Sequence, residues 1–133
     1  MHCAARDVLG RNGMAQYEIS NWSRPGLECR HNLVYWRNGN WWPIGPGASG
    51  HVGGLRWKNV PRLSGYVDNP GFPAISAVEH LDDDGAVGEA FMLGLRLMEG
   101  MSCERVESLL ERGTRGGQRR SAIEHHVASG LLE

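Results

Sequence analysis

Short stretches of helical and alternating hydrophobic periodicity follow one another along this chain. Residues 4–9 are typical of the end of a helix that two glycines stop, and Tyr17 and Ile19 then alternate with polar neighbours as in a strand. No capping residue precedes the first helix. We therefore expect a helix followed by a strand, in a sequence that begins inside a larger fold.

A loop and a short helix are expected next. Residues 21–32 contain a Pro-Gly pair, whose fixed and permissive φ values favour a turn. The side-chain oxygen of Asn32 can accept from the first free backbone N–H groups of a helix through Arg37, so Asn32 is the expected cap. Gly39 then ends this helix.

The middle of the chain is rich in tryptophan and glycine. Residues 40–60 predict two short aromatic-rich strands around a bend, with glycines at Gly45, Gly47, Gly50 and Gly53. Residues 61–73 are loop-rich, with a short helix over 63–67, and they separate the aromatic half from a helical half. We therefore expect two parts, residues 1–60 and residues 61–133.

Three helices are predicted in the second part. Apolar residues recur at helical spacing within residues 82–100, where three aspartates favour the positive N-terminal end and Gly100 is placed to close the helix. Shorter helices are expected over residues 104–112 and 119–129, and Gly130 is placed to cap the last one.

Composition excludes several classes of fold and partner. The 133 residues, 41% of them hydrophobic, are enough for one domain or part of a larger one. A formal charge of -1 gives no general attraction to nucleic acid or an anionic membrane. No apolar run approaches the roughly 20 residues that span a bilayer, and no signal peptide is visible, so we expect no transmembrane segment and a cytoplasmic location. Three widely spaced cysteines indicate reduced thiols.

His31 is the main candidate for binding chemistry. A neutral imidazole is the commonest protein ligand for iron and zinc, and Tyr35 and Trp36 can supply an apolar wall for a macrocycle. Spacing alone favours a plainer interpretation, in which His31 bonds to the loop and the two aromatics are core. Cys29 adds only one further metal ligand, and a buried, inert cysteine is the simpler expectation.

Other motifs indicate structure more than chemistry. The GPGASG segment can hold an anion through its backbone N–H groups, but it fits neither a P-loop nor a dinucleotide fingerprint, and a sharp bend is the simpler interpretation. The five tryptophans are more typical of a core than of a ligand cleft. No serine–histidine–acid arrangement or HExxH motif is present, so the sequence contains no complete catalytic motif.

Two blocks of sequence go beyond these general patterns. YEISNWSRPGLECRHNLVYW (residues 17–36) and IGPGASGHVGGLRWKNV (residues 44–60) resemble, in order and spacing, the C-terminal half of the HemW family. These are radical SAM heme chaperones related to HemN, the oxygen-independent coproporphyrinogen III oxidase. EAFMLGLRLMEG (residues 89–100) is similar to that family's E-x-x-x-x-x-LR-x-x-x-G helix.

The resemblance implies a fold of the α/β to α+β class. Residues 1–60 would form the C-terminal edge of an incomplete radical SAM barrel, with residues 17–21 as its last strand. Residues 61–133 would form a small helical, truncated winged-helix-like domain of the HemN type.

The resemblance also implies a site. The family's HNxxYW motif, which is associated with heme, is matched by His31, Asn32, Tyr35 and Trp36, with His31 as the implied ligand of the heme iron. The glycine bend near the S-adenosylmethionine side of the barrel would be formed by Gly45, Gly47, Ala48 and Ser49.

Two departures from the family pattern limit the expected chemistry. The CxxxCxxC motif that holds the four-iron–four-sulfur cluster is absent, so that cluster and S-adenosylmethionine are expected only in the parent protein. Ser49 stands where HemW-like sequences usually carry histidine and the oxidases an apolar residue. This chain alone is therefore not expected to be catalytic.

The resulting expectation is a C-terminal piece of a HemW-like protein of heme metabolism that binds heme or porphyrin. Its expected partners are the missing N-terminal part of the barrel or a heme-accepting protein, with no nucleic acid. Two alternatives stay open at this point: a fragment of a coproporphyrinogen oxidase-like enzyme, and a non-enzymatic helical module that binds protein.

Overall fold

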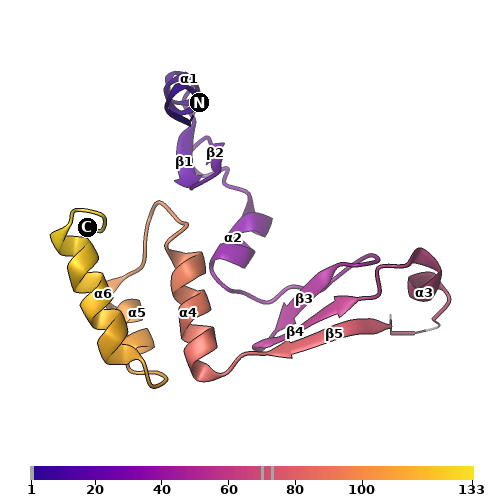
Figure 1. Cartoon of the computed structure of the whole chain (residues 1–133). Coiled ribbons are helices and arrows are strands. Elements are labelled where there is room, and N and C mark those ends of the chain that lie inside the picture. The colour runs from indigo at the N-terminus through magenta and orange to yellow at the C-terminus, as the bar shows by residue number, and fades with distance from the viewer. Residues whose placement is uncertain (1, 70, 73) are drawn as a thin grey trace.

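A computed structural model describes residues 2–69, 71–72 and 74–133, with the side chain of residue 2 left out. These residues form six helices and two small antiparallel sheets, which do not close into a barrel (Figure 1). The helices are α1 (His2–Arg11), α2 (Arg30–Trp36), α3 (Leu63–Val67), α4 (Asp83–Gly94), α5 (Cys103–Leu110) and α6 (Gly116–Ala128). The strands are β1 (Ala15–Glu18), β2 (Asn21–Ser23), β3 (Ser49–Val52), β4 (Leu55–Asn59) and β5 (Ile75–His80).

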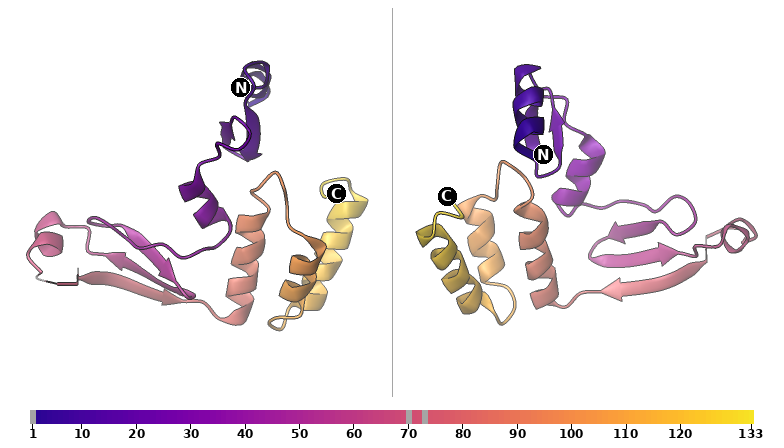
Figure 2. Two further views of the ribbon diagram at one scale, coloured as in Figure 1. Left: turned by 180° about the vertical axis from the view of Figure 1, so that it is seen from behind. Right: turned by 45° about the horizontal axis from the view of Figure 1, so that its top comes forward.

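The elements are spread out rather than gathered around one core. In all views α2 lies between the hairpin of β1 and β2 on one side and the three-stranded sheet on the other, while α4, α5 and α6 pack together (Figures 1 and 2). The accessible surface is 9227 Å². A compact monomer of 14.7 kDa exposes roughly 6,900 Å². The chain therefore leaves about a third more surface uncovered than its mass requires.

The N-terminal hairpin is joined to a segment far along the chain. β1 pairs with β2, and Glu18 also forms a bridge with Leu97. The Ile19 N–H donates to the Arg96 carbonyl at 3.0 Å, and the Met98 N–H donates to the Tyr17 carbonyl at 3.1 Å. The helix and the strand expected within residues 4–20 are confirmed as α1 and β1, but α1 continues through Gly10 and β1 ends at Glu18. The loop expected from residue 21 begins with β2.

This junction explains why the helix expected over residues 82–100 ends early. The aspartates lie at the start of α4 as expected, and the structure makes Asp82 the cap, with its carboxylate accepting from the Gly85 N–H at 2.7 Å. The helix stops at Gly94, however. The Arg96 and Leu97 N–H groups make only tighter bonds to carbonyls three residues earlier, and the Arg96 carbonyl and the Met98 N–H bond to the N-terminal hairpin instead of continuing the helix. Gly100 consequently lies in a turn beyond the helix, and the expectation that it closes α4 is wrong.

A buried carboxylate stabilises the junction. The Glu18 side chain is 0% exposed and accepts hydrogen bonds from the Ser20 N–H, Asn21 Nδ2 and the Arg96 guanidinium. The Arg96 guanidinium also lies 4.1 Å from the centroid of the Trp36 ring. An ionised group can be buried at tolerable cost only when it is paired and hydrogen-bonded, as here.

α2 begins two residues before its expected cap. Cys29 is the N-cap and makes no side-chain capping bond, so the assignment of Asn32 as the cap is wrong. Asn32 lies inside the helix, and its Nδ2 donates to the Tyr17 hydroxyl at 3.4 Å. The left-handed residue after the helix is Asn38, with φ 53°, rather than Gly39.

The second sheet has the order β3-β4-β5. A tight turn at Gly53 and Gly54, both with positive φ, joins β3 to β4. Only part of the expected strand pair over residues 40–60 is confirmed, because Trp41 makes just an isolated bridge to His51 and β3 starts at residue 49. β5 was not expected, and it pairs along β4 across the predicted boundary at residue 60.

The helical part has a small core of its own. Val87 and Ala90 of α4 pack with Leu109 of α5, and Phe91 and Met101 pack against them. The helices expected over residues 104–112 and 119–129 are confirmed as α5 and α6, and Gly130 follows α6 with φ 70°.

Candidate functional site

The four residues of the HNxxYW motif lie on two faces of α2. Residues four apart share a helix face, so His31 and Tyr35 form one pair and Asn32 and Trp36 the other. Asn32 and Trp36 point toward β1 and Arg96, where they help to hold the helix in place. His31 is exposed on the other face.

A direct hydrogen bond fixes the outward pair. The Tyr35 hydroxyl lies 2.8 Å from His31 Nε2, and the two rings meet edge to face with centroids 4.8 Å apart. An imidazole held through one nitrogen has a defined ring orientation, which is how proteins prepare histidine ligands for metals. The pair is therefore a surface imidazole with a preset direction.

Two residues outside the motif extend this pair into the sheet. The Trp41 ring lies 4.6 Å from the Tyr35 ring and 4.9 Å from the His51 ring, measured between centroids. Trp41 is fixed because its Nε1–H donates to the Ser49 carbonyl at 2.9 Å. His51 is only 5% exposed, and its Nδ1 bonds to the Gly39 carbonyl at 2.9 Å. The four rings form a continuous row from the surface of α2 to β3.

Three backbone N–H groups of the glycine bend already donate hydrogen bonds within the chain. The Gly45 N–H donates to the Tyr66 hydroxyl at 3.0 Å, and the Gly47 N–H donates to the Val60 carbonyl at 3.0 Å. The Ala48 N–H donates to the Gly45 carbonyl at 3.4 Å. Gly45 and Gly47 have φ values of 108° and 69°, which only glycine adopts easily. These hydrogen bonds support the bend interpretation over an anion cradle, and the exposed Ser49 begins β3.

A groove of about 390 Å³ runs over one face of the three-stranded sheet, starting at Trp41. Its charged side chains are Arg56, Lys58 and Glu79. The Arg56 guanidinium donates a hydrogen bond to Glu89, which raises the pKa of Arg56 above its ordinary value, and Glu79 lies 3.7 Å from the same group. Both carboxylates are thus directed to Arg56, and Lys58 remains the second cation of the groove.

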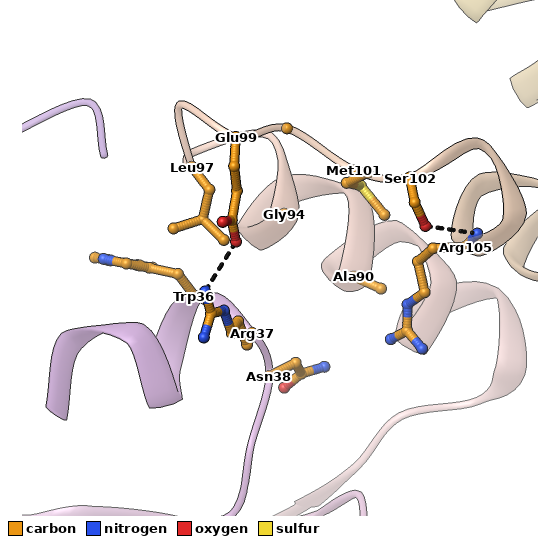
Figure 3. A pocket seen from close by; sticks show the side chains of 11 residues that line it. Trp36, Arg37, Asn38, Ala90, Gly94, Leu97, Glu99, Met101, Ser102 and Arg105 are labelled. Atoms are coloured by element: carbon orange, nitrogen blue, oxygen red, sulfur yellow. Dashed lines mark hydrogen bonds and ion pairs between the residues drawn. The ribbon is translucent and has the colours of Figure 1, made fainter. Parts of the chain in front are cut away.

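A separate pocket lies on the other side of α2 (Figure 3). It has a volume of about 340 Å³ between the end of α2 and α4, and it includes Trp36, Ala90 and Leu97. An ion pair between Arg37 and Glu99, 3.0 Å apart, crosses it. Because Trp36 faces this pocket and Arg96, it does not share the face of His31.

The cysteines are not arranged for a metal site. Cys3, Cys29 and Cys103 are free and exposed, and the expected burial of Cys29 is wrong. Within the described residues, no three His, Cys, Asp or Glu side chains come together in a metal-binding group. No helix in the described part of the chain is long and apolar enough to cross a membrane.

Curated sequences reveal the relationship of this chain. It is 39% identical over 128 residues to the protein named Heme chaperone HemW from Mycobacterium tuberculosis. The matched residues make up 94% of this chain and 30% of the relative. It is 33% identical over 130 residues to the Escherichia coli protein of the same name, covering 94% of this chain and 33% of that relative. The chain belongs to the HemW-like family.

More distant relatives agree with this assignment. A mitochondrial protein named radical S-adenosyl methionine domain-containing protein 1 from Bos taurus is 31% identical over 94 residues, or 71% of this chain and 19% of the relative. The chain therefore spans about a third or less of these relatives' length. No family model matches it, and no solved structure matches it.

Sequence reasoning about this HemW-like chain missed Trp41 and His51 as neighbours of the motif. The sequence pattern places Trp41 only among the tryptophans expected in a core and does not single out His51. The alternation Ser49, His51 along β3 carries a weak signal, since both lie on one face of a strand. Their approach to Tyr35 depends on the path of residues 37–41, which no local pattern encodes.

Proposed function

We propose that this HemW-like chain is a heme-binding part of a longer protein of heme metabolism, and that His31 is the iron ligand. The observation that carries this proposal is the exposed His31 imidazole, oriented by the 2.8 Å hydrogen bond between its Nε2 and the Tyr35 hydroxyl. The relatives that bear the name heme chaperone support the choice of heme as cargo. Heme handling by the whole protein is part of the same proposal.

The residues around His31 fit a flat, amphipathic ligand. An iron porphyrin needs one imidazole lone pair for the metal and apolar surface for the ring. Tyr35 and Trp41 offer aromatic surface next to His31, and the groove continues it across the sheet. Asn32 and Trp36 complete the motif by anchoring α2 to β1 and to Arg96, which keeps the His31 face turned outward.

Radical chemistry is not assigned to this chain. It lacks the CxxxCxxC motif, and its three exposed cysteines come from α1, the start of α2 and α5. These residues do not fit a four-iron–four-sulfur cluster, so we derive no step through such a cluster or through S-adenosylmethionine. The barrel edge and the winged-helix-like domain remain proposals drawn from the family resemblance.

Titration of the purified chain with hemin, followed in the Soret band, tests the proposal. We expect a saturable shift that weakens at least about tenfold, or about 1.4 kcal/mol, in His31→Ala. His125→Ala is the matched control, because His125 is exposed on α6 and outside the motif. No spectral change with the wild-type chain, or an undiminished change with His31→Ala, would refute heme binding through His31.

A further inference from the structure

We propose that the groove beside Trp41 receives the carboxylate-bearing edge of the tetrapyrrole, with Lys58 as the ion-pair partner of a propionate. This inference rests on the proposed heme function, and it assigns a second contact region outside the HNxxYW motif. The groove and the motif are physically joined, so that one ligand can span both.

Contacts between neighbouring rings and strands connect His31 to the groove. Tyr35 lies between His31 and Trp41, with ring centroids 4.8 and 4.6 Å away. Trp41 in turn forms the first wall of the groove and bonds to the Ser49 carbonyl. Ser49 is the register partner of Lys58 across β3 and β4. The groove therefore starts at Trp41, next to the Tyr35 ring that contacts His31.

The shape of the groove follows from the sheet register. Residues directly opposite each other on neighbouring strands share a face, so Ser49, Lys58 and Ala77 form one row. Two small side chains flank the lysine in this row and leave the surface hollow beside Trp41. The resulting volume of about 390 Å³ is within the usual range of ligand pockets.

The charges of the groove favour an acidic ligand group at Lys58. Arg56 is engaged by Glu89 and Glu79. In the part of the chain that the structure describes, no carboxylate lies within ion-pair distance of Lys58, the only lysine of the sequence. Glu79 lies in the next row, beside Arg56, and repels a carboxylate from that end. An indole wall next to an unpaired ammonium complements an apolar ring that carries a propionate.

The test compares hemin with hemin dimethyl ester, in which both propionates are neutral. Lys58→Met should weaken hemin binding about two- to fivefold, as expected for a solvent-exposed pair, and leave binding of the ester unchanged. Arg6→Met is the matched control, because it removes one exposed positive charge from α1. It should change neither affinity.

The outcomes separate this inference from the proposed function. If His31→Ala abolishes binding but Lys58→Met affects hemin no more than Arg6→Met does, the groove assignment is overturned and the heme function stands. An equal loss for hemin and its ester in Lys58→Met also overturns it, because the effect then does not depend on the propionates. Binding that does not depend on His31 contradicts the proposed function instead.

Discussion

Replacement of Arg96 by methionine tests whether the buried carboxylate of Glu18 holds the N-terminal hairpin to the rest of the chain. Methionine keeps much of the apolar stem and removes the guanidinium that bonds to Glu18 Oε2 at 3.2 Å. Glu18 would then be an ionised group without its cation, at a site with 0% exposure. The hydrogen bonds from Ser20 and Asn21 would remain.

Loss of these contacts should lower the free energy of unfolding by several kcal/mol. Removing one partner of a buried ion pair costs about 3–5 kcal/mol. The Arg96 side chain is 29% exposed, so water can replace part of the lost pairing and the lower end applies. Loss of the guanidinium from the Trp36 ring adds about 0.5–1 kcal/mol. We expect a loss of about 3–4 kcal/mol, a large fraction of the stability of a small domain.

Urea unfolding measures this loss, and hydrogen exchange locates it. The amides of Ile19 and Met98, which bond across the junction, should exchange faster in Arg96→Met. Adding Glu18→Gln should recover about 1–2 kcal/mol, because the uncompensated charge is then gone. Arg37→Met is the matched control, since its pair with Glu99 is 57% and 60% exposed and should contribute less than about 1 kcal/mol. If Arg96→Met costs no more than Arg37→Met, the junction does not depend on this pair.

Two further predictions concern the helical part and the sheet. Hydrogen bonds from the Thr114 hydroxyl and from Arg119 lower the pKa of the Asp84 carboxyl, so its contribution to stability is complete above about pH 4 and is lost as the pH falls below that value. Asp84→Asn should flatten this pH dependence when urea unfolding is measured at several pH values. An unchanged loss of stability below about pH 4 would contradict the role given to Asp84. A Cβ at Gly50 would collide with the Pro43 ring. Gly50→Ala should therefore reduce the free energy of unfolding by about 1–3 kcal/mol and lower the thermal midpoint. Gly88→Ala meets nothing within 4 Å on α4 and should stabilise by about 0.4–1 kcal/mol, and equal midpoints for the two variants would refute the packing argument.

The candidate site was partly visible in the sequence. His31 and Tyr35 could be paired from their spacing of four residues, because a helix brings such positions together. The same rule separates Trp36 from His31. The sequence could not place Trp41 beside Tyr35, since that contact is made by a segment that leaves α2 and forms only one bridge to β3.

The sequence by itself determined the elements that depend only on neighbouring residues. The acidic start of α4, the three C-terminal helices and the HNxxYW spacing could all be read from short stretches of sequence. Only the tertiary structure decided where α4 ends, because residues 96–98 pair with β1, almost 80 positions earlier in the chain. It also decided that β5 is a strand, since its hydrogen-bond partner β4 lies beyond a loop. Backbone pairing between distant segments overrides local preference wherever it satisfies more hydrogen bonds, and that choice is made only when the chain is folded.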